Sequence, residues 1–247
     1  MIMRIVVILM FCFVTACSTV HDSEALSTTE AVREPLPPLL DDAYFGEPLE
    51  VYTVTQVFAL TAQQQQDFRK KLKSPAYKSL PPSRQIYRYI QHRLEDFNYH
   101  SDTLISTDVL NRKSGNCLSL AIMTRALVNL TDVEITYELV ETPPIYQSEG
   151  GMLLSSQHIR TVLSDPRAAR SFQMLTLFQN KLTIDYFPVS GTRTLRMVDE
   201  NEFYSMFYRN KAAEAMVANN NNLAFWNLKA ALNQKPDDAQ AINMMGL

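Results

Sequence analysis

Three residues of this chain have the side chains that nucleophilic catalysis by a thiol requires. Cys117 comes directly after a Gly-Asn pair, while His158 and Asp185 lie in two later segments of strand character. A cysteine nucleophile needs a base that takes its proton, and the base needs an acceptor that fixes its tautomer and orientation. Residue type and order therefore predict a site in which Cys117 is the nucleophile, His158 the base and Asp185 the acceptor.

The segment that follows Cys117 is expected to be a buried helix. Residues 118–130 are apolar except for a narrow polar face, which is typical of a helix in the middle of a domain. The positive end of the helix dipole would lie at Cys117 and favour a thiolate. Each of the three residues also has a simpler interpretation: the cysteine as a buried small side chain, the histidine as an ordinary strand residue, and the aspartate as a cap of the turn before Pro188.

Three strands are expected after this helix, at residues 133–140, 157–163 and 181–187. Alternation gives the second strand two faces, one with Ile159, Thr161 and Leu163 and the other with His158, Arg160 and Val162. If the second and third strands are antiparallel neighbours, His158 and Asp185 lie side by side on one sheet face, with the helix N-terminus above them. Helices followed by strands, rather than alternating units, predict an α+β fold.

Shorter elements are expected in the first half of the domain. Residues 51–57 favour a strand or an extended segment. Thr61 is expected to cap a helix that ends at Leu72, and Ser83 is expected to cap a second helix whose apolar residues recur at helical spacing. Thr107 would cap a short third helix.

The first 17 residues have the pattern of a targeting segment. Arg4 precedes the apolar run 5–14, which is too short to cross a bilayer as a helix, and small residues then lead into Cys17. This order resembles the lipobox of bacterial lipoproteins, which implies that Cys17 becomes the lipid-modified N-terminus. Ser18 in the next position implies a cell-envelope protein in the outer membrane, facing the periplasm. An ordinary signal peptide with an incidental cysteine is the alternative.

Processing at this position would leave a single thiol. Cys12 would leave with the signal peptide and Cys17 would be acylated, so Cys117 would have no intramolecular disulfide partner in a compartment that oxidises thiols. A lone thiol there is either buried and inert or kept for its reactivity. Residues 18–40, with many Ser, Thr, Glu and Pro, are expected to be a flexible tether to a folded domain.

Composition excludes some other classes of protein. A chain of 247 residues with 46% hydrophobic residues and a net charge of −3 suits one good-sized domain with a small appendage, and its charge argues against a nucleic-acid partner. One thiol with scattered histidines, such as His92 and His100, does not make a zinc site. Gly150-Gly151 has the pattern of a turn rather than of a phosphate-binding loop. No metal or other cofactor is therefore expected.

The C-terminal region resembles a tetratricopeptide repeat. On a frame of about 34 residues counted back from Pro236, the marked positions are Tyr208, Ala212, Ala224, Leu228 and Ala231. Residues 236–246 resemble the join to a second copy. One repeat cannot bury its own hydrophobic face. Either it packs on the preceding domain or the chain is a shortened form of a longer one, and the second is expected because the sequence ends within a helix.

Gly-Asn-Cys-Leu-Ser at the start of a buried helix, then a strand with His158, then Ile-Asp-Tyr-Phe-Pro, resembles the transglutaminase-like superfamily of papain-like cysteine enzymes. The resemblance implies a transglutaminase-like domain at residues 41–200, with N-terminal helices and a central cysteine-bearing helix on an antiparallel sheet. A tetratricopeptide region at 201–247 would then bind a protein partner. The resemblance to the transglutaminase-like superfamily also implies acyl transfer on a protein or peptide substrate. The reaction would be amide hydrolysis, transamidation or deamidation through a thioester on Cys117.

Such chemistry needs an oxyanion donor besides the Cys117 backbone N–H, and Asn116, Tyr99 and Gln157 are the candidates. The activity itself is open between a cysteine peptidase and an acyltransferase. The alternative is a non-catalytic scaffold, in which a degenerate domain and the repeat hold a partner in the cell envelope.

Overall fold

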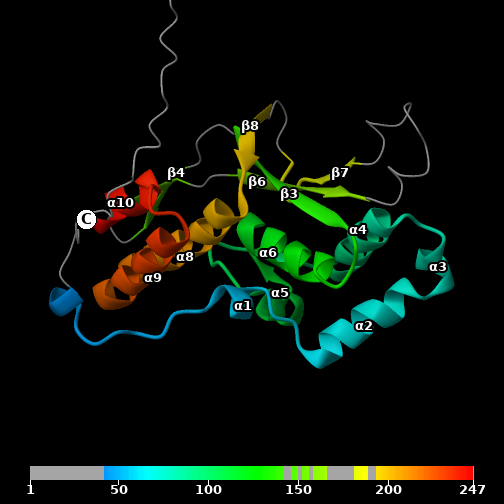
Figure 1. Cartoon of the computed structure of the whole chain (residues 1–247), viewed down its shortest axis with the longest axis horizontal. Coiled ribbons are helices and arrows are strands. Elements are labelled where there is room, and N and C mark those ends of the chain that lie inside the picture. The colour runs from blue at the N-terminus through cyan, green and yellow to red at the C-terminus, as the bar shows by residue number, and fades with distance from the viewer. Residues whose placement is uncertain are drawn as a thin grey trace, which may run out of the picture. The chain divides into compact units, whose positions relative to one another are not determined.

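The computed structural model describes residues 42–141, 146–149, 152–155, 158–165, 181–188 and 193–246. Every described residue belongs to one compact unit, Pro38–Leu247. This unit is a mixed α+β fold in which helices pack on a four-stranded antiparallel sheet (Figure 1). The predicted targeting segment, the Cys17 lipidation site and the tether lie outside the described residues.

The helices that precede the sheet are short. They are η1 (Asp42–Phe45), α1 (Val54–Val57), α2 (Ala62–Leu72), α3 (Pro75–Lys78), α4 (Pro82–Arg93) and α5 (Ser106–Arg112). The predicted helix from Thr61 to Leu72 is confirmed, and Thr61 shares a capping box with Gln64. The prediction of extended structure over residues 51–57 is wrong at Val54–Val57, where the chain forms the helix α1. A second capping box, between Thr53 and Gln56, closes a helical turn there.

The predicted caps of α4 and α5 differ from those observed. Ser83 is not the cap of α4: its N–H and its hydroxyl both donate to the carboxylate of Asp165, at 2.9 and 2.6 Å. Asp165, which is distant in the sequence, therefore accepts hydrogen bonds from the first turn of this helix. Thr107 is not the cap of α5, because the helix begins one residue earlier, at Ser106. The Thr107 hydroxyl instead donates to the backbone oxygen of Ala59.

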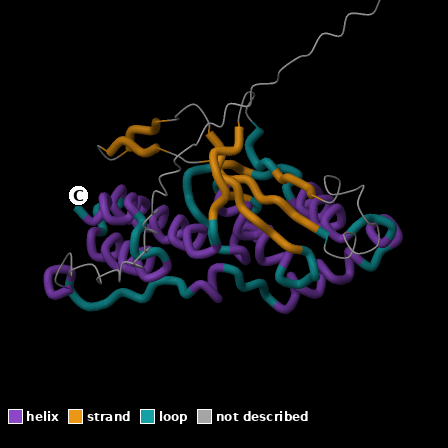
Figure 2. Tube along the Cα trace, turned by 45° about the horizontal axis from the view of Figure 1, so that its top comes forward, coloured by secondary structure: helices purple, strands orange, loops and turns teal. Residues whose placement is uncertain are grey.

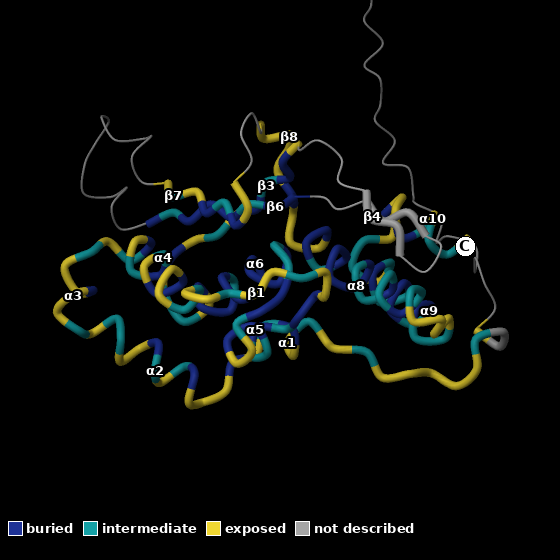
Figure 3. Tube along the Cα trace, turned by 180° about the vertical axis from the view of Figure 1, so that it is seen from behind, coloured by how far each residue is buried: buried dark blue, intermediate teal, exposed yellow. Residues whose placement is uncertain are grey.

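The predicted central helix is present as α6 (Cys117–Val128). Its buried side chains surround almost the whole helix, as a helix in the middle of a domain requires, and include Leu118, Leu120, Ala121, Ile122, Met123, Ala126, Leu127 and Val128. Arg125 marks its polar edge and forms an ion pair with Glu200 at 2.6 Å. Buried residues run along α6, whereas α2 and α3 are largely exposed (Figure 3). The helix lies between α4 and α8 (Figure 1).

The sheet has the strand order β7-β6-β3-β8, and all neighbours are antiparallel. The strands are β3 (Glu134–Glu141), β6 (His158–Ser164), β7 (Lys181–Ile184) and β8 (Arg193–Val198). They gather on one side of the helices (Figure 2). The three predicted strands are present, but β7 ends at Ile184, so Asp185 follows the strand instead of lying within it as predicted. β8 was not predicted: it is short, and all its residues before Val198 are exposed, including the apolar Leu195 and Met197.

Two smaller strand pairs flank this arrangement. β1 (Asn98–Tyr99) and β2 (Ser114–Gly115) pair in parallel just before α6, and β4 (Tyr146–Glu149) and β5 (Met152–Ser155) form an antiparallel pair. The first pair holds the chain in place as it enters α6.

Three helices follow the sheet: α8 (Glu200–Val217), α9 (Asn221–Gln234) and α10 (Ala239–Met245). The side chains at the five marked repeat positions are all buried. Phe203 of α8 stacks on Tyr137 of β3, with ring centroids 3.9 Å apart, so these helices pack on the preceding part of the same unit. Within the described ranges, none of the helices combines the length and apolarity that crossing a bilayer needs.

Candidate active site around Cys117

Cys117 is the first residue of α6, as predicted. Asn116 is the N-cap: its side-chain oxygen accepts the N–H of Ser119 at 2.9 Å, and the Ser119 hydroxyl accepts the N–H of Asn116 at 3.3 Å. This capping box fixes the first turn of the helix and with it the position of the cysteine.

The Gly-Asn-Cys-Leu-Ser sequence has a steric reason for its glycine. Gly115 has φ +135°, a conformation that residues with a side chain rarely adopt. A Cβ atom there would lie 2.7 Å from the Cβ of Ser119. Glycine therefore allows Ser119 to approach closely enough to complete the capping box.

The side chain of Asn116 is fully used by the local structure. Besides capping α6, its amide donates to the backbone oxygen of Ser101 at 2.9 Å and to the hydroxyl oxygen of Thr103 at 2.8 Å. The suggestion that Asn116 is an oxyanion donor is therefore wrong, because both of its amide hydrogens already have partners. Gln157, another candidate donor, lies outside the described residues.

His158 and Asp185 form a hydrogen bond. His158 is the first residue of β6 and Asp185 directly follows β7, and these strands are antiparallel neighbours. The His158 Nε2 atom lies 2.7 Å from Asp185 Oδ1, which also accepts the N–H of Phe187 at 3.1 Å. The His158 side chain is only 7% exposed. With Nε2 turned to Asp185, Nδ1 is the ring nitrogen that can serve a second group.

The thiol of Cys117 lies against the start of β6. Its sulfur accepts a hydrogen bond from the backbone N–H of Ile159, the residue after His158. Burial raises the pKa of the Cys117 thiol, and the charge of Asp185 adds to this, while backbone N–H groups of Ile159, Leu118 and Cys117 act in the opposite direction. The thiol thus lies near Asp185 and the start of β6, but burial outweighs the helix N-terminus, and the thiol form is favoured at rest.

Arg160 connects Asp185 to the rest of the sheet face. Its Nη1 atom lies 3.5 Å from Asp185 Oδ2, and its Nη2 donates to the hydroxyl of Thr194 on β8 at 3.1 Å. Thr194 in turn donates to Glu138 on β3 at 2.9 Å. Sequence alternation placed Arg160 on the face of His158, but its partner Asp185 could not be identified without the strand pairing. The two oxygens of Asp185 therefore have separate partners, His158 and Arg160.

A buried polar chain fixes the strands against the helix on the opposite sheet face. The hydroxyls of Tyr186 and Thr161 are 2.8 Å apart, and the Tyr186 hydroxyl donates to that of Thr124 on α6 at 2.6 Å. Tyr186 directly follows Asp185, so this chain links the cysteine helix, the histidine strand and the aspartate segment. Burial raises the pKa of Tyr186, which keeps its hydroxyl protonated and able to donate.

Tyr99 borders the site from the β1–β2 pair. Its hydroxyl donates to the backbone oxygen of Tyr186. Burial raises the pKa of Tyr99, and the charges of Cys117 and Asp185 raise it further, which places the phenol beside both. Because its proton is engaged with Tyr186, Tyr99 would have to break this bond to serve as an oxyanion donor.

Helix α8 reaches the loop that orients Asn116. Thr103 in this loop donates its N–H to Glu214 at 2.6 Å, and its hydroxyl oxygen accepts from Asn210 at 3.0 Å as well as from Asn116. Thr103 is only 1% exposed. The C-terminal helices therefore support the cap that positions Cys117, a contact that the sequence did not suggest.

No family model matches the chain, and comparisons with curated proteins and with solved structures found no match either. Among the described residues, no group of three or more His, Cys, Asp or Glu side chains is arranged to hold a metal ion. The interpretation of the site therefore rests on its own geometry.

Proposed function

We propose that this protein is a cysteine acyl-transfer enzyme with a transglutaminase-like, papain-like domain. Cys117 is the nucleophile, His158 the base and Asp185 the acid that orients the base. The observation that carries the proposal is the 2.7 Å hydrogen bond between His158 and Asp185, formed beside a cysteine at the first turn of a buried helix. This arrangement meets the requirement for an activated nucleophile with an oriented base.

The first half of the reaction forms a thioester. The sulfur of Cys117 attacks the carbonyl carbon of an amide while His158 takes the thiol proton. The C–N bond then breaks, and the same proton passes from His158 to the leaving amine or ammonia. The backbone N–H groups of Leu118 and Cys117, in the first turn of α6, lower the pKa of the thiol, and they are the donors that this proposal assigns to the oxyanion.

The second half of the reaction releases the acyl group. Water attacks the thioester in hydrolysis or deamidation, and an amine attacks it in transamidation. His158 accepts the proton of the attacking group and returns it to the sulfur of Cys117. Because burial raises the pKa of Cys117, proton transfer accompanies the attack, and a thiolate does not wait in the resting enzyme.

The other parts of the chain suit a role in the cell envelope. The helices α8, α9 and α10, with buried side chains at the marked repeat positions, support a tetratricopeptide region that binds a protein partner. The sequence around Cys17 supports a lipid anchor in the outer membrane, with the domain in the periplasm. A protein or peptide is the substrate class that this placement favours.

The proposal is tested with an activated ester, p-nitrophenyl acetate. The wild-type protein is expected to release p-nitrophenolate in a burst of about one equivalent and to carry an acetyl thioester on Cys117, detected by mass spectrometry of the peptide. Cys117→Ala should show neither, and Asp185→Asn should slow the burst at least about tenfold because His158 loses its acceptor. The absence of an acetyl adduct on Cys117 in the wild type would contradict the proposal.

A non-catalytic scaffold is the second candidate, and the raised pKa of Cys117 favours it, since an inert buried cysteine has this property. In that case Cys117→Ala keeps its protein partners and its role in the cell. A Cys117→Ala protein that retains partners in a pull-down but loses its cellular role speaks against the scaffold.

A further inference from the structure

The basic residues of the chain are concentrated on the helices α2, α3 and α4. Residues 68–94 hold eight of the 23 Lys and Arg residues and none of the 26 Asp and Glu residues, in a chain with a net charge of −3. Six of the eight are exposed: Arg69, Lys70, Lys73, Lys78, Arg84 and Arg88. Such segregation creates a local positive potential that the total charge conceals.

These charges are not neutralised within the fold. Among the described residues, none of the eight side chains forms an ion pair with a carboxylate. Lys71 and Arg88 instead lie over the ring of Tyr77, and Arg93 lies over that of Tyr89. Placing like charges together raises the free energy of the folded state, so an anion that binds among them is stabilised.

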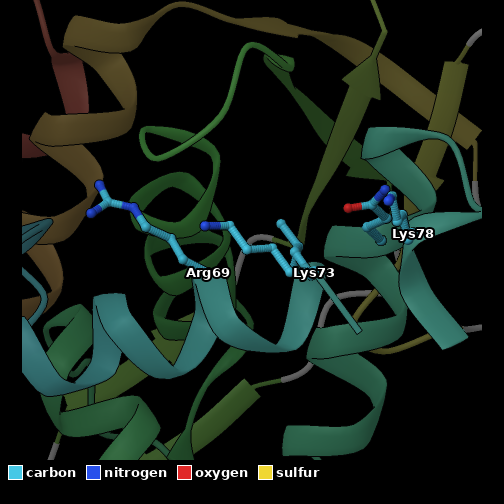
Figure 4. Close-up of a pocket in the computed structure, with 5 residues that line it drawn as sticks. Arg69, Lys73 and Lys78 are labelled. Atoms are coloured by element: carbon cyan, nitrogen blue, oxygen red, sulfur yellow. The ribbon is translucent and has the colours of Figure 1, made fainter. Parts of the chain in front are cut away.

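Three of the exposed cations line a pocket between the helices. The pocket has a volume of ≈ 480 Å³ and is lined by Arg69, Leu72, Lys73, Lys78 and Gln85. Arg69 and Lys73 project from the same side of α2, and Lys78 lies at the opposite edge (Figure 4). The Gln85 amide adds a neutral hydrogen-bond donor, and Leu72 adds an apolar wall.

We propose that this pocket binds a phosphate group. A phosphate carries more negative charge and more acceptor oxygens than a carboxylate, so it matches three cations better. The planar guanidinium of Arg69 suits paired phosphate oxygens, and the two ammonium groups supply further charge. The phosphate belongs either to a soluble ligand or to a lipid headgroup. The site is separate from Cys117, and its existence does not depend on the proposed catalysis.

The experiment measures calorimetric binding of inorganic pyrophosphate to the full chain at low ionic strength. Lys73→Gln/Lys78→Gln removes two cations of the pocket. Lys70→Gln/Arg84→Gln removes the same charge from exposed positions of α2 and α4 outside the pocket lining. The pocket pair is expected to weaken binding at least about tenfold, and the control pair less than about threefold. Arg69→Gln provides a third, independent test of the pocket.

Sedimentation with vesicles distinguishes the two sources of phosphate. If the ligand is a lipid, phosphatidylglycerol vesicles bind more protein than phosphatidylcholine vesicles, and the pocket pair removes this difference. If the ligand is soluble, pyrophosphate binds and the two kinds of vesicle do not differ. Equal losses in the pocket and control pairs, binding of polyglutamate as tight as that of pyrophosphate, or no binding of either phosphate source would overturn the proposal.

Discussion

Asp185 uses its two carboxylate oxygens for different partners. This arrangement explains how an aspartate at the edge of the solvent can hold a histidine in one orientation. One oxygen receives His158 and a backbone N–H, while the other faces Arg160. A carboxylate anchored on both sides cannot rotate away from the imidazole without losing an ionic contact. Arg160 thus acts as a positioning residue for the site.

Arg160→Met is expected to slow the p-nitrophenyl acetate burst about tenfold, equivalent to ~1.4 kcal/mol in the barrier, because Asp185 loses the group that holds its second oxygen. The pH profile of the burst should change as well, since His158 is then held less firmly. Arg193→Met is the matched control. Arg193 pairs with Glu141 on the neighbouring strands but is 77% exposed, and its loss should leave the burst unchanged. Equal effects of the two variants would contradict the role of Arg160.

Gly115→Ala is expected to destabilise the protein by about 2–4 kcal/mol in urea unfolding, because the variant combines an unfavourable backbone conformation with a clash against Ser119. Gly46→Ala is the control. Gly46 also has a positive φ, +69°, but the nearest atom to an added Cβ is 3.6 Å away, so a cost of only about 1 kcal/mol is expected. Similar losses at the two positions would show that the clash is relieved.

Residue identity alone located much of the candidate site. The helix start at Cys117 and the strand face of His158 could be predicted because both properties are local in sequence, but the pairing of His158 with Asp185 depended on the two strands being antiparallel neighbours. The role of Asn116 was misjudged because its amide is satisfied by Ser101 and Thr103, and such contacts depend on how loops fold back. Arg160 was placed on the correct face, but its partner follows only from strand order.

At the scale of elements, a contact between distant segments replaces the local cap of α4. Asp165, just after β6, receives the N–H and hydroxyl of Ser83 in the first turn of α4. A carboxylate at a helix N-terminus satisfies exposed N–H groups and favours the helix dipole. The strand that begins with His158 is therefore tied to α4 at its other end.

A double-mutant cycle between Ser83→Ala and Asp165→Ala tests this connection. Each single variant is expected to lower the free energy of unfolding by about 1–2 kcal/mol, and the double variant by about 1 kcal/mol less than their sum. Thr61→Ala, which removes the local cap of α2, should combine additively with Asp165→Ala because the two sites share no partner. Additive losses for the Ser83 pair would contradict the contact.

The helices and strands that could be predicted are those whose stabilising residues are close together in the sequence. α2, α6 and the strands of the buried sheet were predictable because their caps and apolar patterns lie within a few residues of one another. α1 was not, since the capping box between Thr53 and Gln56 overcomes residues that favour strands. β8 was not predicted, and its alternating apolar residues Leu195 and Met197 lie on the exposed surface rather than in the core.

At the scale of the whole unit, Glu202 of α8 joins the sheet to the end of α9. It forms ion pairs with Arg196 of β8 and, at 3.0 Å, with Lys235. The hydrogen bond from Arg196 is the largest influence and, with Lys235, lowers the pKa of Glu202 from the ordinary 4.5 to about 2. The C-terminal helices are therefore held to the sheet by charge as well as by Phe203.

The ion pairs of Glu202 make the free energy of unfolding depend on pH. Because the folded pKa of Glu202 is below the unfolded one, its contribution is complete above about pH 4.5 and is lost as the pH falls toward about 2. Glu202→Gln should lower the free energy of unfolding by about 1–2 kcal/mol near neutral pH, after allowance for the exposure of Arg196 and Lys235, and by little near pH 2. Urea unfolding of both proteins from pH 7 to 2 measures this, and parallel pH curves would contradict it.

The most direct test of the central claim is the rate at which iodoacetamide alkylates Cys117 as a function of pH, in the wild type and in His158→Gln. If His158 serves as the base for this partly buried thiol, the wild type should react at least about tenfold faster at pH 7, with a profile that extends to lower pH. In the variant, the thiol should react only at a pH well above the ordinary thiol value, because burial raises the pKa of Cys117. Coincident profiles for the two proteins would show that His158 does not act on Cys117.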